Sequence, residues 1–455
     1  MKRRFSILLH IFVVLALSAC GAARQPSRLP DPNEVKALLV QLVDVDKRAP
    51  GIVVGMIAAD PPERWVVGYG RLSATDERVP NGDTVFEIAS VTKVFTGFLL
   101  AQAVLNGEVK LDDPISMYLP AGVTAPEYEG KSITLLDLAT HTAGLPRWPS
   151  NVPVVGSNPF ADYTIDQMYD FLSGYRLTRA PGSTYEYSNY GFSLLGNLLA
   201  RRAGQEDYEA LLLERITRPL GMDSTRIELT PDMRSRLGTP HSSYAGVSTN
   251  WHAPALAGSG AILSTANDLL TFLAANMGIT DTELRPALQL ASTPQRPGEL
   301  LAYIGLGWNL PQSGNGIQYH GGGHLGYSSF LAWDSERQIG VVVLMNVLDG
   351  PRDQIGFPLL RGFPLTPVPV DPQVLAAYAG TYQFDDFEVT IRVDGARIYL
   401  RVPTNQEFEL IAISENQFYL KEAYIEIAFY RNDRGEVERM EMVVIGGTLE
   451  ATRIP

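Results

Sequence analysis

The sequence predicts an α+β protein that carries a small all-β domain at its C-terminal end. Strand-like runs stand at both ends of residues 34–362, and helical periodicity fills the part between about residues 134 and 277. That order favours one mostly antiparallel sheet built from both ends of the segment, flanked by helices and joined to a helical subdomain. Over residues 373–455, alternating apolar runs are separated by D-G, E-N and D-R-G turns, which predicts a small barrel or sandwich.

Length and composition indicate folded domains rather than a disordered chain. The 455 residues are long for one domain, and 45% are hydrophobic against 19% charged. The formal net charge is −13 and no basic run follows the first four residues. A nucleic-acid partner is therefore not expected.

The first twenty residues predict a bacterial lipoprotein signal peptide. Three basic residues precede an apolar run from Phe5 to Leu17, which is too short to span a bilayer and ends in small residues. The sequence L-S-A-C, ending at Cys20, resembles a lipobox, in which the cysteine is lipidated; plain cleavage with Cys20 incidental is the alternative. We therefore expect an exported protein, lipid-anchored in the cell envelope through Cys20 and a tether over residues 21–33. It would be periplasmic, and Gly21 is compatible with the outer membrane if the host is Gram-negative.

Individual elements follow from periodicity and turn residues. The stretch from Val91 to Leu105 is apolar nearly all round, which predicts a helix buried inside the domain and ending at Asn106-Gly107. Beyond the signal, no segment reaches the ~18 apolar residues of a membrane-spanning helix. Other helices are expected over 34–47, 165–172, 191–203, 207–216 and 267–277, strands over 51–59, 65–70, 303–308, 316–320, 326–333 and 339–346, and a Pro-rich linker over 363–372.

The first candidate for chemistry is the pair Ser90 and Lys93, in S-V-T-K at the start of the buried helix. Residues three apart share a helix face, so both side chains can point into one cleft. Burial favours the neutral amine, which can accept the serine proton and make the hydroxyl a nucleophile. The alternative is a helix N-cap with a lysine on the helix rim.

The second candidate is the triplet Tyr187-Ser188-Asn189, just before the helix expected over 191–203. A phenol there can relay a proton to a leaving group, and the amide of Asn189 can orient a substrate amide. Tyr187 as a core aromatic is the alternative.

The third candidate is H-G-G-G-H, where a strand runs into His320, Gly321, Gly322 and Gly323. The glycines let a substrate backbone lie against the strand edge. A backbone N–H near Gly323, together with that of Ser90, would make an oxyanion hole. His324-Leu325-Gly326 also fits His-x-Gly, but His320 stands at the end of the strand. The histidines are four apart, but the glycines between them disfavour the helix that a metal pair would need, so no metal is expected.

The order Ser-x-x-Lys, Tyr-x-Asn, His-x-Gly resembles the serine β-lactamase and penicillin-binding protein superfamily. Tyrosine in the second motif resembles the class C branch, which includes AmpC-type β-lactamases and D-alanyl-D-alanine carboxypeptidases/endopeptidases. The resemblance covers about residues 34–360 and implies a β-lactamase/transpeptidase-like fold. The C-terminal domain looks like the small lipocalin-like β domain of some members. The supporting stretches are V-F-E-I-A-S-V-T-K, I-T-L-L-D-L-A-T-H-T-A-G-L-P, P-G-S-T-Y-E-Y-S-N-Y-G, I-T-R-P-L-G-M and H-G-G-G-H-L-G-Y-S-S.

The resemblance also implies roles for the site residues. Ser90 would be acylated, Lys93 would accept its proton, and Tyr187 would act as partner base and as acid toward the leaving nitrogen. Asn189 would bind the substrate amide, and His320 would hold the substrate carboxylate or tune Tyr187. No cofactor is implied. Members often have Lys-Thr-Gly where this chain has His-Gly-Gly, which weakens the expectation of efficient β-lactamase activity because neutral histidine is a poorer carboxylate anchor.

The resulting functional hypothesis is a penicillin-binding D-alanyl-D-alanine carboxypeptidase or endopeptidase acting on peptidoglycan. A class C-like β-lactamase and an esterase of the same fold are the catalytic alternatives. A non-catalytic envelope lipoprotein that uses the fold for binding is a fourth. His141 and Thr142, in a family-like stretch, are interpreted as structural support.

Overall fold

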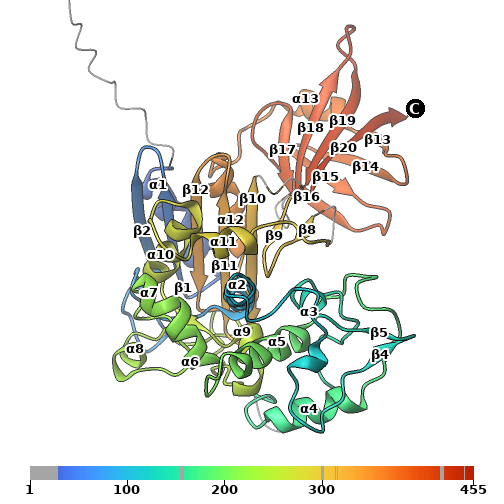
Figure 1. Ribbon diagram of the computed structural model, residues 1–455. Coiled ribbons are helices and arrows are strands. Elements are labelled where there is room, and N and C mark those ends of the chain that lie inside the picture. Colours follow the sequence, from blue (N-terminus) through green and yellow to red (C-terminus); the bar gives the residue numbers. More distant parts are fainter. Residues whose placement is uncertain are drawn as a thin grey trace, which may run out of the picture.

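The computed structural model describes residues 29–153, 158–298, 302–312, 314, 316–420, 425–444 and 446–454 (Figure 1). The predicted signal peptide, Cys20 and most of the predicted tether lie outside these residues. The last part of the tether was predicted wrongly, because Leu29 is buried and helix α1 (Pro32–Val40) begins with Asp31 as its N-cap. No helix among the described residues is long and apolar enough to cross a bilayer.

An eight-stranded antiparallel sheet forms the centre of the catalytic region, in the order β2-β1-β12-β11-β10-β9-β8-β7. Strand β1 pairs with β12 along its length, so the two ends of this region share one sheet, as the sequence predicted. The strands are β1 (Gly51–Ala58), β2 (Glu63–Gly70), β7 (Arg296–Pro297), β8 (Tyr303–Ile304), β9 (Asn309–Leu310), β10 (Ile317–His324), β11 (Tyr327–Asp334) and β12 (Ile339–Met345).

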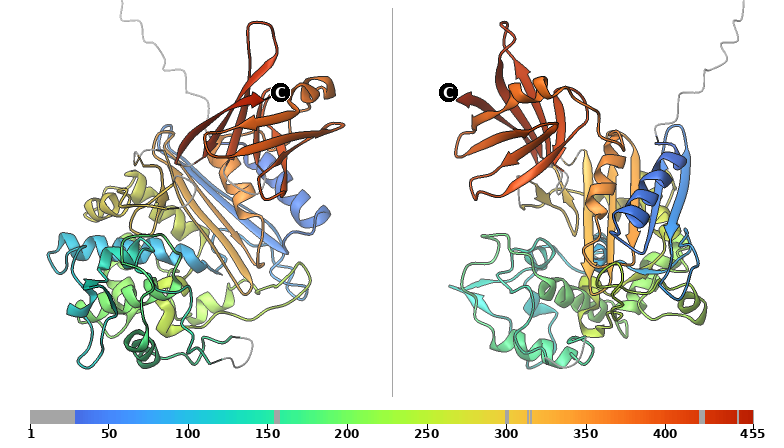
Figure 2. Two further views of the ribbon diagram at one scale, coloured as in Figure 1. Left: turned by 90° about the vertical axis from the view of Figure 1, so that its right-hand side faces the viewer. Right: turned by 180° about the vertical axis from the view of Figure 1, so that it is seen from behind.

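Helices cover both faces of this sheet, which explains why its central strands are apolar without alternation. Val54 and Val343 face a core shared with α1 and α12 (Arg352–Arg361). Val53 and Val342 face the opposite core, shared with α2 (Thr92–Leu105), α10 (Ala266–Met277) and α11 (Arg285–Ala291). In the left view of Figure 2 the sheet lies between these two helical layers.

The helical subdomain follows α2 in the chain and begins with two helices capped by threonine. Thr134 and Thr164 each form a capping box, at the starts of α3 (Leu135–Ala139) and α4 (Ile165–Gly174). The helices that follow are α5 (Asn189–Arg202), α6 (Tyr208–Leu212), α7 (Arg218–Leu220), α8 (Pro231–Ser235) and α9 (Ala257–Gly260).

Shorter elements connect these parts of the catalytic region. They are π-helical turns at Gln41–Val45 and Leu213–Thr217, and 3-10 turns at Ala89–Val91, Ile115–Met117 and Pro254–Leu256. Two short strand pairs join β3 (Phe86–Glu87) to β6 (Leu263–Ser264) and β4 (Glu127–Tyr128) to β5 (Lys131–Ser132).

The strand predicted over 303–308 is wrong in its second half. Only Tyr303 and Ile304 form β8, and the chain then turns before β9. The turn packs on the backbone of α2: a Cβ on Gly97 would lie 1.9 Å from the Leu306 carbonyl oxygen, and one on Gly307 would lie 2.3 Å from that of Lys93. Close backbone approach to α2, rather than strand pairing, therefore fixes this segment.

The C-terminal domain is a closed barrel of eight antiparallel strands, preceded by α13 (Pro372–Tyr378). Its interior is filled by apolar side chains. Tyr378 stacks on Phe429 with ring centroids 4.3 Å apart, and Phe418 lies against both rings. The strands are β13 (Gly380–Gln383), β14 (Glu388–Asp394), β15 (Arg397–Arg401), β16 (Glu407–Ala412), β17 (Gln417–Leu420), β18 (Ile425–Arg431), β19 (Val437–Val444) and β20 (Gly447–Ile454).

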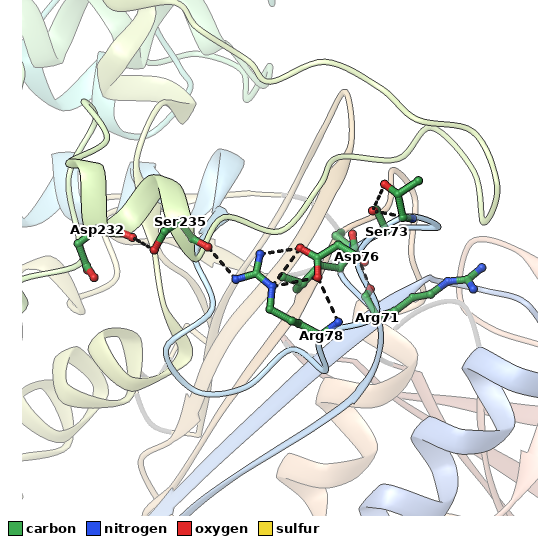
Figure 3. A network of polar contacts seen from close by, with 9 residues as sticks. Arg71, Ser73, Asp76, Arg78, Asp232 and Ser235 are labelled. Atoms are coloured by element: carbon green, nitrogen blue, oxygen red, sulfur yellow. Dashed lines mark hydrogen bonds and ion pairs between the residues drawn. The ribbon is translucent and has the colours of Figure 1, made fainter.

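Two polar links tie outlying parts to the catalytic region. Arg361, at the end of α12, donates from Nε to Glu426 of the barrel at 2.9 Å. Arg78, in the loop after β2, donates hydrogen bonds to both carboxylate oxygens of Asp76 and to the Ser235 carbonyl at the end of α8 (Figure 3). The loop leading to β3 is thereby attached to the helical layer.

Candidate active site

Ser90 stands in a strained turn between β3 and α2. Ala89, the residue before it, has a φ of +46°, a conformation that costs a non-glycine residue of the order of 1 kcal/mol. No side chain caps α2, so Ser90 is not the N-cap of the alternative interpretation. Instead its Oγ lies 3.2 Å from Lys93 Nζ and 2.9 Å from Tyr187 Oη.

Lys93 is completely buried in the first turn of α2. Its Nζ lies 2.8 Å from Asn189 Oδ1 and 2.7 Å from the Ser259 carbonyl oxygen. Burial lowers the pKa of Lys93 well below its usual value, and the positive charge of Arg147 lowers it further. A neutral amine can donate to Asn189 and Ser259 and still accept a proton from Ser90.

Tyr187 also contacts Ser90, and Lys93 Nζ lies 4.8 Å from the centre of the Tyr187 ring. Burial raises the pKa of Tyr187 to about 12, although its contact with Ser90 and the charges of Arg147 and Arg352 lower it in part. The resting side chain is therefore a phenol that donates to Ser90 Oγ. Of the two groups, neutral Lys93 is the one able to take up the serine proton.

His141 fixes the loop that carries Tyr187. Its ring lies over the Tyr187 ring at a centroid distance of 4.4 Å, and its Nδ1 accepts from the Ser188 N–H at 3.0 Å. Burial lowers the pKa of His141 well below its usual value, so the ring is a neutral acceptor. Ser188 then caps α5 through the Gly191 N–H, which places Asn189 in the first turn of that helix.

The glycine-rich end of β10 lies directly against the Ser90 turn. A Cβ on Gly322 would lie 2.4 Å from the Ile88 carbonyl oxygen and 3.1 Å from Ser90 N, so only glycine fits there. Asn309 donates to the Tyr319 carbonyl, which therefore points away from β11. Because backbone direction alternates along a strand, the groups of Gly321 and Gly323 lie on that same edge, beyond the contact with β9. The N–H groups of Gly323 and Ser90 are thus the candidate oxyanion donors.

With the geometry of the site described, the chain can be compared with known proteins. The β-lactamase family matches residues 35–361. The chain belongs to the β-lactamase family. A second family, described only as a domain of unknown function, DUF3471, matches residues 366–452, which include the barrel.

Curated relatives and solved structures agree with this membership. The chain is 33% identical over 331 residues to the D-alanyl-D-alanine-carboxypeptidase/endopeptidase AmpH of Escherichia coli K12, covering 66% of this chain and 83% of AmpH. A β-lactamase/D-alanine carboxypeptidase from Yersinia pestis, solved with citrate, is 29% identical with a TM-score of 0.57, over 69% of this chain and 94% of that one. An octameric penicillin-binding protein homologue from Pyrococcus abyssi, at 21% identity and a TM-score of 0.61, shares the fold over 91% of this chain and 99% of its own.

Within this β-lactamase family site, His320 is buried and uncharged. Its Nδ1 lies 2.7 Å from the Gly321 carbonyl oxygen, and burial lowers the pKa of His320 to about 3, with Lys93 and Arg352 contributing. A neutral imidazole offers a substrate carboxylate no charge. His324 points elsewhere, to the Gly260 carbonyl and Glu87. Among the described residues no group of three or more His, Cys, Asp or Glu side chains could hold a metal.

Three residues of the site carried no signal that the sequence analysis used. Ser259 contributes only its backbone carbonyl oxygen, which a residue of any type would provide. The Arg147 guanidinium lies 5.3 Å from the centre of the Tyr187 ring. Arg352, the first residue of α12, lies along the glycine edge: a Cβ on Gly321 would meet its Nε at 3.1 Å, and one on Gly323 its Nη1 at 3.4 Å.

Together these groups can perform acyl transfer. The Ser90 oxygen can attack a carbonyl carbon while its proton moves to Lys93 Nζ, and two backbone N–H groups can hold the resulting oxyanion. The Tyr187 phenol can protonate the departing atom. The chain is therefore equipped as a serine hydrolase of this family.

Proposed function

We propose that this protein is a D-alanyl-D-alanine carboxypeptidase/endopeptidase that cleaves peptidoglycan peptides through an acyl-enzyme on Ser90. The observation that carries the proposal is the position of the Ser90 Oγ between Lys93 Nζ and Tyr187 Oη, at 3.2 and 2.9 Å. The 33% identity to AmpH, whose name states this activity, supports the choice of substrate.

The proposed reaction has two halves. In acylation, Ser90 Oγ bonds to the carbonyl carbon of the penultimate D-alanine, Lys93 takes the serine proton, and the bond to the terminal nitrogen breaks as Tyr187 protonates that nitrogen. The proton held by Lys93 then returns to the tyrosinate. In deacylation a water attacks the ester, gives one proton to this pair, and restores the Ser90 hydroxyl.

The carboxypeptidase reaction needs a cation for the terminal carboxylate, and Arg352 is the residue we assign to it. Its side chain is 23% exposed and packs against β10 at Gly321 and Gly323, and its positive charge is close enough to lower the pKa values of Tyr187 and His320. In the part of the chain that the structure describes, the Arg352 Nε has no hydrogen-bond partner, and Asp353 approaches the guanidinium only to 3.6 Å. A planar guanidinium suits a carboxylate better than neutral His320 does.

D-Alanine release from a muropeptide ending in D-Ala-D-Ala tests the proposal, with Ser90→Ala as the inactive control. Arg352→Gln should lower kcat/KM for this substrate by about 10–100-fold, the worth of a charge-assisted hydrogen bond. Arg361→Gln, at the other end of α12, should leave it unchanged. Active Ser90→Ala, or no D-alanine release by protein that a β-lactam acylates, would refute the assignment.

The same site suits two other reactions. Intact mass measured over time with a penicillin separates them: a long-lived adduct on Ser90 indicates a penicillin-binding peptidase, and consumed antibiotic without an adduct indicates a β-lactamase. Intact antibiotic without an adduct, combined with turnover of a nitrophenyl ester, indicates an esterase. Wild-type function in Ser90→Ala would instead indicate a binding protein.

We also propose that Cys20 is lipidated and anchors the protein in the cell envelope. The basic n-region, the apolar run and L-S-A-C support this proposal. In a bacterial host, wild-type protein should enter the detergent phase of a membrane extraction and incorporate labelled fatty acid. Cys20→Ser should do neither, and equal labelling of both would overturn it.

A further inference from the structure

A second pair of polar side chains lies behind the Ser90 turn, outside the groups used above. Glu87, the last residue of β3, is three residues before Ser90, and His324, the last residue of β10, directly follows Gly323. Their side chains are 4% and 16% exposed, and Glu87 Oε2 lies 3.3 Å from His324 Nδ1.

The hydrogen bonds around this pair require one proton between the two residues. His324 Nε2 lies 3.2 Å from the Gly260 carbonyl oxygen, which can only accept, so Nε2 carries a hydrogen. Within the described residues Nδ1 has no hydrogen-bond partner, and Glu87 Oε2 lies 3.3 Å from it. If Nδ1 and Glu87 Oε2 were both bare, two acceptors would face each other in a buried place, which is costly.

The other neighbours of the pair do not supply this proton. The second oxygen of Glu87 accepts from Asn250 Nδ2 at 2.8 Å and from the Trp251 N–H at 2.9 Å, and this N–H also lies 3.2 Å from Oε2. The Trp251 ring stacks on His324, with centroids 5.0 Å apart. The Tyr327 hydroxyl is already committed to the Gly238 carbonyl. Lys93 disfavours a positive imidazole at His324 only while Lys93 itself carries a proton.

Burial places the shared proton on the carboxyl group. It raises the pKa of Glu87 to about 7, against the hydrogen bonds from Asn250 and Trp251, and it lowers the pKa of His324 to about 4. Below neutral pH the pair is therefore a glutamic acid that donates to a neutral imidazole. Above neutral pH, the ionised carboxylate of Glu87 faces the lone pair of His324 Nδ1.

We propose that this shared proton joins the Ser90 turn to the end of β10, so that Glu87 and His324 are a pH-sensitive positioning pair for the acyl-transfer site. The Ser90 turn carries the Ser90 N–H and the end of β10 carries the Gly323 N–H, and these are the two candidate oxyanion donors. A second contact of the Ser90 turn, from Ser329 Oγ of the neighbouring strand β11 to the Ile88 carbonyl at 2.7 Å, contains no titratable group. Loss of the shared proton at alkaline pH thus loosens one side of the oxyanion hole. The inference rests on Ser90 being the nucleophile.

Glu87→Gln is the decisive variant, because its amide donates to His324 Nδ1 at every pH while its oxygen still accepts from Asn250 and Trp251. The measurement is the rate of Ser90 acylation by a β-lactam as a function of pH. In the wild type the rate should fall above pH about 7, approaching roughly tenfold per pH unit for a single ionisation. Glu87→Gln should lack this fall and keep the wild-type rate below neutral pH. An identical fall in both proteins would overturn the proposal.

Infrared spectroscopy of the wild type provides a readout that does not depend on catalysis or on the variant folding. Below neutral pH a protonated carboxyl band should be present, should shift in protein made with isotope-labelled glutamate, and should disappear over the pH range in which acylation slows. Absence of a glutamate-sensitive band would overturn the inference. Failure of the wild type to be acylated at any pH by either a β-lactam or a nitrophenyl ester would instead refute Ser90 as nucleophile, while the infrared measurement would still test the pair.

Discussion

Replacing Tyr187 by phenylalanine tests which group takes the proton of Ser90. The two candidates contact the same oxygen, 2.9 Å away for Tyr187 Oη and 3.2 Å for Lys93 Nζ. Burial acts on them in opposite senses: it raises the pKa of Tyr187 to about 12, which keeps the phenol protonated, and it lowers that of Lys93, which frees the amine. Lys93 is therefore the base, and acylation should rise with pH as Lys93 loses its proton.

Tyr187→Phe removes only the hydroxyl and leaves the ring stacked on His141. We expect the acylation rate to fall by about 10²–10⁴-fold, the usual contribution of one positioned proton donor or acceptor. The acid side of the pH–rate profile should stay at the wild-type pH, because Lys93 still titrates there. The assay is the pH dependence of acylation by a chromogenic β-lactam or nitrophenyl ester. If the acid side moved by more than about one pH unit or vanished, a tyrosinate would be the base, and the reasoning would be wrong.

Three further predictions concern stability and the separation of the domains. His141→Ala should lower the free energy of unfolding by about 1–3 kcal/mol, because the buried Ser188 N–H loses its acceptor, whereas His141→Asn, which suits the φ of +59° and offers an oxygen, should lose less; urea unfolding of both variants measures this. Because the pKa of Glu87 is raised, its protonated form contributes stability that is complete below pH 4.5 and is lost as the pH rises to about 7. At pH 8 the free energy of unfolding of Glu87→Gln should therefore exceed that of the wild type by about 3 kcal/mol, and equal urea midpoints would contradict this. Phe429→Ala should destabilise the barrel by about 3–5 kcal/mol while Ser90 acylation continues, which calorimetry and β-lactam labelling of the same sample would show; loss of labelling at a temperature where the barrel alone has melted would refute this separation.

Much of the fold could be predicted from the sequence because local pattern and tertiary environment agree there. The helix from Val91 to Leu105 is apolar all round because it lies in the core, and β1 and β12 are continuously apolar because both faces of the sheet are covered. The segment 303–308 was mispredicted because close backbone contact with α2 overrides its strand propensity. A contact of that kind leaves only glycines in the sequence, and glycines alone do not identify their partner.

The residues of the site likewise differ in how far the sequence alone identifies them. Ser90 and Lys93 are three residues apart on a helical turn, so their proximity can be predicted from the sequence alone. Tyr187 and Asn189 needed the resemblance to connect them with Ser90, since almost a hundred residues intervene. Arg352 is the first residue of an ordinary helix, and only the packing of α12 on the sheet brings it to the β10 edge. The neutral state of His320 likewise depends on burial that the motif does not encode.

The filled interior of the barrel limits what the C-terminal domain can contribute. Eight-stranded barrels that carry small molecules keep an empty centre, and here Tyr378, Phe418 and Phe429 occupy it. A pocket of about 240 Å³ remains beside these rings, between the barrel strands and the linker that precedes them, and Val368, Ile398 and Leu410 contribute to its lining. Any small molecule that the domain binds would therefore lie at this linker-covered pocket rather than in a wide central cavity.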